Sequence, residues 1–262
     1  MCGLIGGIAR KPLSRDRIKK GLDVLDHRGP DGQGQWSDGH FFLGHTRLSI
    51  IGLSNGDQPM SNAEGDVHLA VNGEFYGYRA IRDELRAKGG KFKTESDSEI
   101  ALHLYLQHGM RATEQLRGEF AALIADQRRD IMIAIRDRFG IKPLFYTVTP
   151  DGVFFASEIK ALLALGAPAA WDAEAAWQDL YIFRNHERTL FAGIRSVPQG
   201  CYAIARGNDV QIYRYWDWDF PTTEETAADK RSEAEVVAGF REVLSDAVGE
   251  RMVADVEVGC YL

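Results

Sequence analysis

Hydrophobic positions follow two periods along this chain, and each period predicts one type of element. Residues 3–9 form a short apolar run with interspersed glycines, typical of a buried strand that another backbone approaches closely. Asn72-Gly73, a pair suited to a turn with positive φ angles, ends the strand predicted at 67–71. The strands predicted within residues 120–156 follow one another closely along the chain, which indicates an antiparallel meander. The further strands are predicted at 40–51, 120–125, 131–136, 144–148, 153–156, 201–205, 210–216 and 256–262.

Other segments carry the helical period and its start and stop signals. Residues 78–88 suit a helix closed by Gly89. Ser96-Asp97-Ser98-Glu99 has the spacing of a capping box, which predicts a helix running to Gly109 with Asp97 in its first turn. Additional helices are predicted at 15–25, 159–165 and 173–183. This mixture of helices and antiparallel hairpins indicates an α+β protein.

The chain changes character near residue 220. Residues 221–231 are polar and acidic and lack an apolar period, so they suit a linker. A second capping box, Ser232-Glu233-Ala234-Glu235, then opens an amphipathic helix. Its apolar stripe consists of Val236, Val237, Phe240, Val243, Leu244 and Val248. We therefore expect a main domain at 1–220, a linker, and at 232–262 the start of a second, truncated domain.

Composition excludes several functions. The chain of 262 residues is 45% hydrophobic and 26% charged, as expected of a soluble globular protein. Its net charge of −7 gives no basic field for a phosphate backbone, which argues against nucleic acid as a partner. Without a signal peptide or an apolar run near the roughly 18 residues that a membrane span needs, we expect no membrane association and a cytoplasmic location.

Cys2 is the main candidate for chemistry. Removal of Met1 would leave a thiol and a free α-amine on one residue, with ordinary pKa values of about 8.5 and about 7.7–8.0. Such an amine accepts a proton near neutrality, so nucleophile and base could share Cys2. A lone cysteine is more often a small buried hydrophobe, but the strand at 3–9 ties this terminus down. The widely spaced Cys2, Cys201 and Cys260 support neither disulfides nor a metal site.

Seven segments, in their order along the chain, resemble the class II glutamine amidotransferases, and most closely the glutamine-hydrolysing asparagine synthetases of the N-terminal nucleophile hydrolase superfamily. The resemblance implies that residues 1–220 are a glutaminase domain with a four-layer α/β/β/α fold of two mainly antiparallel sheets. The segments are Met1-Cys2-Gly3, His27-Arg28-Gly29-Pro30-Asp31-Gly32, Arg47-Leu48-Ser49-Ile50, Val71-Asn72-Gly73-Glu74, Ser96-Asp97-Ser98-Glu99, Arg136-Asp137-Arg138-Phe139-Gly140-Ile141-Lys142-Pro143-Leu144 and Ala156-Ser157-Glu158-Ile159-Lys160-Ala161-Leu162.

The resemblance assigns the catalytic roles. The Cys2 thiol attacks the side-chain amide of glutamine, its α-amine relays the proton to departing ammonia, and water hydrolyses the γ-glutamyl thioester. The Asn72 side chain and the Gly73 backbone N–H stabilise the oxyanion. Without the resemblance, Asn72-Gly73 would be interpreted as a hairpin turn.

The resemblance also implies how glutamine is bound. Arg47 offers a planar fork for the α-carboxylate, and Asp97 accepts the α-ammonium group. Glu74 and the backbone of Leu48, Ser49, Ile50 and Ile51 complete the pocket, and the loop at 28–32 shields the thioester from water. The structural alternatives are a surface salt bridge for Arg47, a helix-dipole interaction for Asp97 and a rigid turn for the loop.

No cofactor or metal is expected for the glutaminase half. ATP and Mg²⁺ are expected only with the missing synthetase domain, because the last eight residues resemble the strand ahead of that domain's pyrophosphate loop. Leu262 would then lie at the edge of an ATP site in a longer protein. The expected partners are glutamine and the C-terminal synthetase domain, and the resemblance allows a homodimer.

Three other interpretations stay open. The ammonia could amidate a carboxylate other than aspartate, as in natural-product assembly. The domain could be a catalytically silent regulatory or interaction module, although the intact set of Cys2, Arg47, Asn72-Gly73 and Asp97 argues against this. A thiol hydrolase of unrelated fold would pair Cys2 with a histidine and would work with Met1 retained. The histidines considered, none of which receives a role, are His27, His45, His103 and His186.

Overall fold

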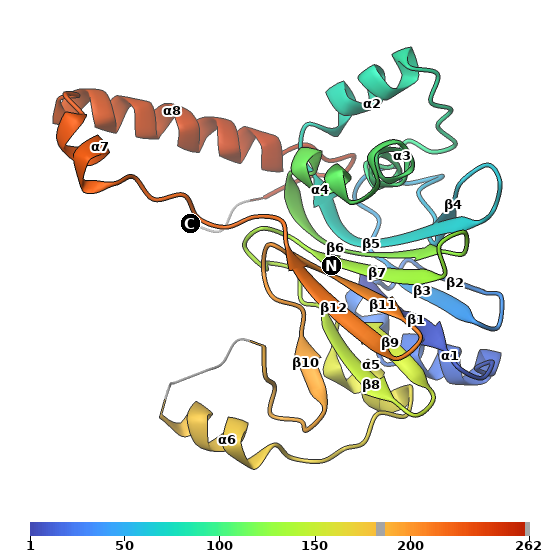
Figure 1. The fold of residues 1–262 in the computed structure, drawn as a ribbon. Helices are drawn as coiled ribbons and strands as arrows, with labels where there is room; N and C mark the ends of the chain where they lie inside the picture. The colour runs from blue at the N-terminus through green and yellow to red at the C-terminus, as the bar shows by residue number, and fades with distance from the viewer. Residues whose placement is uncertain (182–186, 260–262) are drawn as a thin grey trace.

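Two six-stranded antiparallel sheets lie face to face in the computed structural model, which describes residues 1–181 and 187–259 (Figure 1). The first sheet has the order β10 (Ile194–Ser196), β8 (Phe145–Thr149), β9 (Gly152–Ala156), β1 (Gly3–Ala9), β3 (Phe41–Arg47) and β2 (Gly32–Ser37). The second has the order β12 (Asp209–Arg214), β11 (Cys201–Arg206), β7 (Ile131–Arg136), β6 (Gly118–Asp126), β5 (Val67–Phe75) and β4 (Met60–Ser61).

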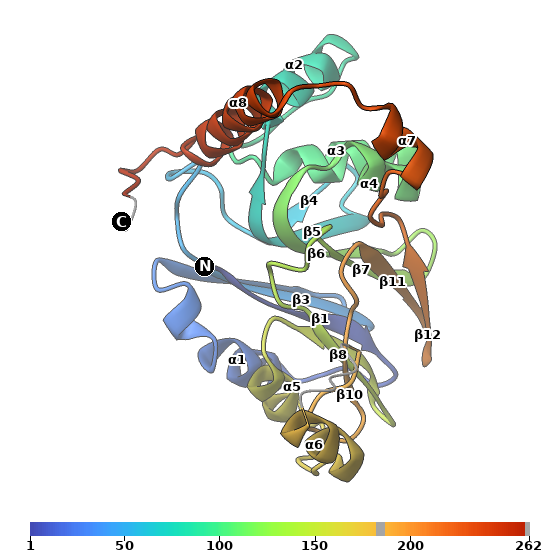
Figure 2. The ribbon, with the colours of Figure 1, turned by 90° about the vertical axis from the view of Figure 1, so that its left-hand side faces the viewer.

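Helices cover the outer faces of both sheets (Figure 2). The first sheet is covered by α1 (Arg15–Asp23) and α5 (Ile159–Ala164), and the second by α2 (Tyr78–Ala87), α3 (Glu99–His108) and α4 (Ala112–Gln115). Short 3₁₀ turns at Asp26–Arg28 and Gly109–Arg111 follow α1 and α3, and α6 (Ala173–Leu180) lies beyond α5. The predicted four-layer α/β/β/α fold is confirmed.

The first strand shows why the sequence requires two cores. Leu4 and Ile8 of β1 belong to the core between the sheets, whereas Ile5 and Ala9 belong to the core beneath α1 and α5. Because successive side chains of a strand point to opposite faces, an uninterrupted apolar run suits a strand buried on both sides. Full burial of a side chain such as Ile5 contributes roughly 1.5–3 kcal/mol relative to exposure. The terminus beside Cys2 is therefore held firmly.

Asn72-Gly73 does not form the predicted turn. Strand β5 runs through both residues, and Asn72 pairs with Ala121 and Gly73 with Phe120 of β6. Gly73 does have a positive φ of 140°, and a Cβ there would overlap the carbonyl oxygen of Glu119. Nine paired positions between β5 and β6 outweigh the local preference of Asn-Gly for a turn.

The predicted capping box at 96–99 is also wrong. Helix α3 begins at Glu99 after an N-cap at Ser98 whose side chain makes no capping bond. The Glu99 carboxylate instead accepts the backbone N–H groups of Lys93 and Thr94 at 2.8 and 2.7 Å. Asp97 therefore precedes the helix, and its side chain is available to another part of the fold.

The strands at 120–156 do not form a single meander. Strands β6 and β7 pair in the second sheet, while β8 and β9 pair in the first, so the chain crosses between sheets after β7. The predicted hairpin formed by β11 and β12 is confirmed. The predicted strand at 40–51 ends at Arg47, and helix α6 ends at Leu180, so residues 182–183 of its predicted range lie outside the described residues.

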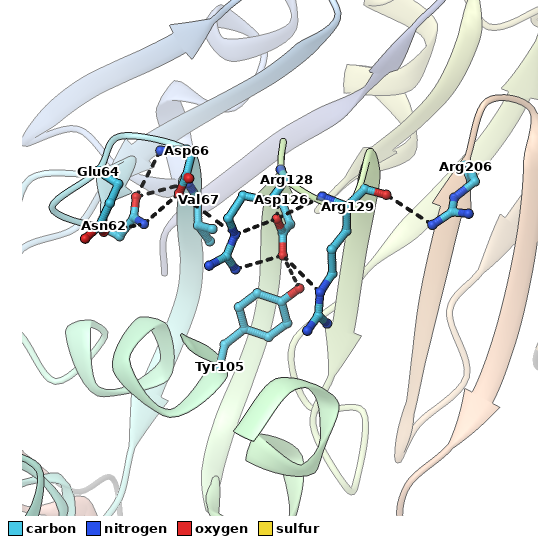
Figure 3. A network of polar contacts seen from close by, with 9 residues as sticks. All are labelled: Asn62, Glu64, Asp66, Val67, Tyr105, Asp126, Arg128, Arg129 and Arg206. Carbon is cyan, nitrogen blue, oxygen red and sulfur yellow. Dashed lines mark hydrogen bonds and ion pairs between the residues drawn. The ribbon is translucent and has the colours of Figure 1, made fainter. Parts of the chain in front are cut away.

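A polar network fixes the end of the β5–β6 pair remote from Gly73 (Figure 3). The buried Asp126 carboxylate accepts the Tyr105 hydroxyl at 2.7 Å and two bonds from the Arg128 side chain, at 3.1 and 3.0 Å. Burial alone would raise the pKa of Asp126, but these bonds lower it below its ordinary value. The network anchors α3 to β6 and belongs to the scaffold.

The C-terminal region differs in part from expectation. The predicted linker contains α7 (Thr223–Ala228), and α8 (Glu233–Arg251) begins at the predicted capping box of Ser232 and Glu235. The apolar stripe of α8 is exposed along a helix that projects from the sheets (Figure 1). Residues 256–259 form no strand, and 260–262 lie outside the described residues. Within the described residues, no helix has the length and apolar character to cross a membrane.

Candidate active site

A pocket lies where β1, β3 and β5 meet the loops around them. Nine of the predicted site residues line it: Cys2, Arg47, Leu48, Ile50, Ile51, Asn72, Gly73, Glu74 and Asp97. Ser49 is not among the lining residues. The prediction missed the others, Met1, Gly56, Gln58, Val71, Ser96, Ser98 and Lys142. Lys142 lies in one of the family segments, whereas the loop residues Gly56 and Gln58 carry no local signal.

The Cys2 sulfur lies against the backbone of the segment that follows β3. Its Sγ accepts the Leu48 N–H at 3.3 Å and lies 3.6 Å from the Leu48 oxygen. Burial raises the pKa of the Cys2 thiol, although the Leu48 backbone contact acts in the opposite direction. The thiol is therefore protonated near neutrality and needs a base to become a nucleophile.

Arg28 fixes the backbone of Cys2. Its Nε donates to the Cys2 carbonyl oxygen at 2.8 Å, and its Nη1 donates to Glu158 at 2.8 Å. Burial alone would raise the pKa of Glu158, but bonds from Arg28, Lys160 and His27 lower it to about 2. Glu158 therefore stays ionised and holds the guanidinium in place. Both residues occur in family segments, yet no local pattern assigns them this role.

Asn72 lines the pocket and carries a buried donor without a partner in the described part of the chain. The residue is 1% exposed, and the donor is its Nδ2. A buried donor without a partner is costly, and such groups are rare in folded proteins. Since Gly73 lines the same pocket, the two consecutive residues can serve an anionic oxygen beside Cys2.

Arg47 is the last residue of β3, and only 9% of its surface is exposed. Its Nη2 donates to the Gly52 oxygen at 2.6 Å, and its Nη1 donates to the Leu53 oxygen at 3.3 Å and to Asp57 at 3.1 Å. Asp57 is largely exposed, so Arg47 does form a salt bridge at the surface. Because the arginine also lines the pocket, a substrate carboxylate can reach this cation.

Two carboxylates, those of Asp97 and Glu74, give the pocket negative charge to set against the positive charge of Arg47. Asp97 is 4% exposed and accepts the Phe75 N–H at 2.7 Å. Burial raises the pKa of Asp97 to about 6, against the effect of the Phe75 bond, and neighbouring Glu74 adds to the rise. Burial also raises the pKa of Glu74, while Lys142 lowers it. Asp97 can thus accept a cation in the pocket, and it lies ahead of the N-cap of α3 and not in the first turn.

The loop at 28–32 supports the strand that carries Arg47. The Asp31 N–H donates to the Arg47 oxygen at 3.0 Å, and the Asp31 carboxylate accepts the Ser49 N–H at 2.7 Å. None of these loop residues lines the pocket. Its proposed role as a cover for the thioester stays a prediction.

No histidine is among the described residues that line the pocket. His45 is buried, its Nε2 lies 3.0 Å from the Val71 oxygen, and burial lowers its pKa to about 4. His27 contacts Glu158, His103 contacts Glu99, and His186 lies outside the described residues. The arrangement gives no support to a thiol–histidine pair.

A model of the glutamine amidotransferase domain matches residues 1–216. Amidase chry2 of Gibberella zeae is 40% identical over all of this chain and 41% of its own length. Amidase chyE of Penicillium rubens is 41% identical over 94% of this chain and 36% of its own length. Glutamine-hydrolysing asparagine synthetase 1 of Bacillus subtilis is 36% identical over all of this chain and 42% of its own length. The chain thus spans about two-fifths of these relatives.

The fold has solved counterparts. Glutamine phosphoribosylpyrophosphate amidotransferase from B. subtilis aligns with a TM-score of 0.63 at 23% identity, over 82% of this chain and 49% of that one. At this identity the likeness concerns the fold alone. The match over residues 1–216, with the relatives at 36–41% identity, shows that the chain belongs to the class II glutamine amidotransferase family.

Proposed function

We propose that this chain hydrolyses glutamine to glutamate and ammonia through a γ-glutamyl thioester on Cys2. The observation that carries the proposal is that Asn72 lines the same pocket as Cys2 and that its buried Nδ2 has no hydrogen-bond partner among the described residues. A preorganised donor of this kind gains its partner when an oxyanion forms in the transition state.

The chemistry follows from the groups in the pocket. After removal of Met1, the Cys2 α-amine takes the thiol proton, and sulfur bonds to the side-chain carbonyl carbon of glutamine. The oxyanion accepts hydrogen bonds from Asn72 and Gly73. Its collapse breaks the C–N bond, and the α-ammonium returns the proton to the departing ammonia. Water, deprotonated by the same amine, then attacks the thioester carbon. The C–S bond breaks, glutamate is released, and the α-ammonium returns its proton to the Cys2 thiolate.

Opposite charges orient the substrate. The α-carboxylate of glutamine is bound by Arg47 and its α-ammonium group by Asp97, with Glu74 adding negative charge. The backbone of residues 48–51 completes the binding surface. Two charged contacts on one small molecule fix its orientation, so the side-chain amide is directed to the Cys2 sulfur.

The ammonia is proposed to serve an ATP-dependent amidation of aspartate to asparagine in a longer form of the protein. The 36% identity to a glutamine-hydrolysing asparagine synthetase supports this acceptor. ATP and Mg²⁺ would bind to the synthetase domain, with Leu262 at the edge of that site. The two relatives named amidases favour a second candidate, in which another carboxylate receives the ammonia.

The test is release of ammonia and glutamate from glutamine, in equal amounts, by the wild-type chain and by Cys2→Ala. Loss of both products in Cys2→Ala supports the proposal, whereas equal release by both proteins contradicts it. Folded wild-type protein that releases neither product would support a silent domain. The acceptor is tested in the longer form with ATP, Mg²⁺ and aspartate, where a product other than asparagine would favour the second candidate.

A further inference from the structure

Asp255, which follows α8, contacts the loop behind Arg47 at two points. Its carboxylate accepts the Gly52 N–H at 2.8 Å, and its own N–H donates to the Ile50 oxygen at 2.9 Å. Gly52 is buried, so its N–H needs an acceptor within the protein. A residue about 200 positions away in the chain supplies it.

The same glycine holds Arg47. The Gly52 oxygen accepts Nη2 of Arg47 at 2.6 Å, the shortest of the bonds to this guanidinium. Gly52 has a positive φ of 67°, and a Cβ there would lie 2.8 Å from the Ser96 nitrogen, so the loop turns tightly against the wall of the pocket. Ile50 and Ile51, which precede Gly52, line the pocket directly. Displacement of Gly52 would therefore move both the guanidinium and the backbone that contacts the substrate.

The end of α8 is held beside the pocket by a second set of charges. Arg251 contacts Glu119 at 2.9 Å, and Glu119 contacts Lys142 at 3.3 Å. Lys142 lines the pocket. Arg117 and Glu250 add an ion pair at 3.1 Å. The segment from α8 to Asp255 is therefore connected to the pocket at two places. Arg251 reaches Lys142 through Glu119, and Asp255 contacts Ile50 and Gly52.

We propose that Asp255 is a positioning residue for glutamine binding. Its carboxylate holds Gly52, and Gly52 presents the Arg47 guanidinium to the substrate's α-carboxylate. The affinity for glutamine then depends on where the segment after α8 lies. This inference rests on the proposed function, because it assumes that the pocket binds glutamine through Arg47.

Binding is best measured without turnover. In a Cys2→Ala background, calorimetry would compare L-glutamine binding to the parent, Asp255→Ala and Asp255→Asn. We expect the alanine variant to bind about two- to tenfold more weakly, the range that loss of one hydrogen bond produces. Asparagine keeps an acceptor oxygen for Gly52 and should restore the affinity. Asp246→Ala, at an exposed position of α8, is the matched control and should bind like the parent.

A double-mutant cycle separates positioning from general destabilisation. If Asp255 acts through Arg47, Asp255→Ala should weaken binding much less once Arg47 is already changed to Lys. Hydrogen exchange of the Gly52 amide should be faster in Asp255→Ala and near that of the parent in Asp255→Asn. Circular dichroism verifies the fold of every variant.

The outcomes are distinct. Unchanged glutamine affinity in Asp255→Ala, with faster exchange at Gly52, would overturn the positioning role. Equal weakening by Asp255→Ala in the presence and absence of Arg47→Lys would also overturn it. Failure of the Cys2→Ala parent itself to bind glutamine would instead overturn the proposed function of the pocket.

Discussion

The guanidinium of Arg28 donates to the carbonyl oxygen of Cys2 at 2.8 Å, so the turn after α1 fixes the peptide that carries the nucleophile. Glu158, just ahead of α5, holds that guanidinium from the other side at 2.8 Å. The position of the Cys2 backbone thus depends on residues from two separate parts of the chain, neither of which lines the pocket.

Arg28→Gln is expected to lower kcat about 10- to 100-fold, because the backbone of Cys2 loses a charge-assisted hydrogen bond. The KM for glutamine should change less, since Arg28 is not among the residues that line the pocket. Steady-state kinetics would measure both constants, with Arg10→Gln at an exposed position as the matched control. A large rise in KM with normal kcat would argue against this positioning role.

Asn72→Ala is expected to lower kcat on the order of 10²–10³-fold with little change in KM, because the amide acts on charge that develops in the transition state. The variant should be no less stable than the wild type, since it removes a buried donor that has no partner within the described residues. Kinetics and urea denaturation test the two statements. An effect confined to KM would assign Asn72 to ground-state binding instead.

Glutamine binding should weaken below a pH of about 6. The pKa of Asp97 is about 6 in the unliganded pocket because the carboxyl is buried, and only its ionised form attracts the substrate's α-ammonium group. We expect the KM to rise as the pH falls through this value. Asp97→Asn should bind weakly at every pH. A KM profile that keeps the same rise in Asp97→Asn would show that another group is responsible.

The same residue should limit stability at neutral pH. The folded-state pKa of Asp97 is raised from 3.8 to about 6, so folded protein binds the proton more tightly than unfolded protein. The free energy of unfolding therefore falls as the pH rises between about 4 and 6 and stays lower above that range. Asp97→Asn should be more stable than the wild type at a pH of about 8, on the order of 1–3 kcal/mol, and the difference should vanish near a pH of about 4. Urea denaturation at the two pH values measures it.

Gly73→Ala should destabilise the fold by about 2–4 kcal/mol, because its φ is strained for other residues and the added Cβ overlaps the Glu119 oxygen. Gly32→Ala is the matched control, since a Cβ at that position has no atom within 4 Å. Thermal or urea denaturation would compare the variants. Equal stability of the two would contradict the observed path of β5 through Gly73.

Local pattern was sufficient for the elements whose hydrophobic period matches their burial in the fold. The apolar run of β1 and the helix closed by Gly89 were predicted with nearly the observed bounds. Asn72-Gly73 was misread because its preference for a turn is local, whereas pairing with β6 depends on residues nearly fifty positions away. The capping box failed for a similar reason, since Glu99 is used by the backbone at Lys93 and Thr94.

The site was predictable where a residue type carries its own chemistry. The thiol of Cys2, the fork of Arg47 and the carboxylate of Asp97 met in one pocket as expected. Arg28 and Asp255 could not be assigned from the sequence, because their roles consist of single hydrogen bonds to distant backbone groups. Such contacts exist only once the two sheets and α8 are in place.

The central claim is that Cys2 supplies both nucleophile and base. The most direct test is ammonia release from glutamine by protein whose first residue is verified as Cys2, compared with Cys2→Ala and with protein blocked at the Cys2 α-amine by a retained Met1. The account predicts release only from the unblocked protein with an intact thiol. Undiminished release from the blocked form would contradict it, because the base would then be a group other than the α-amine.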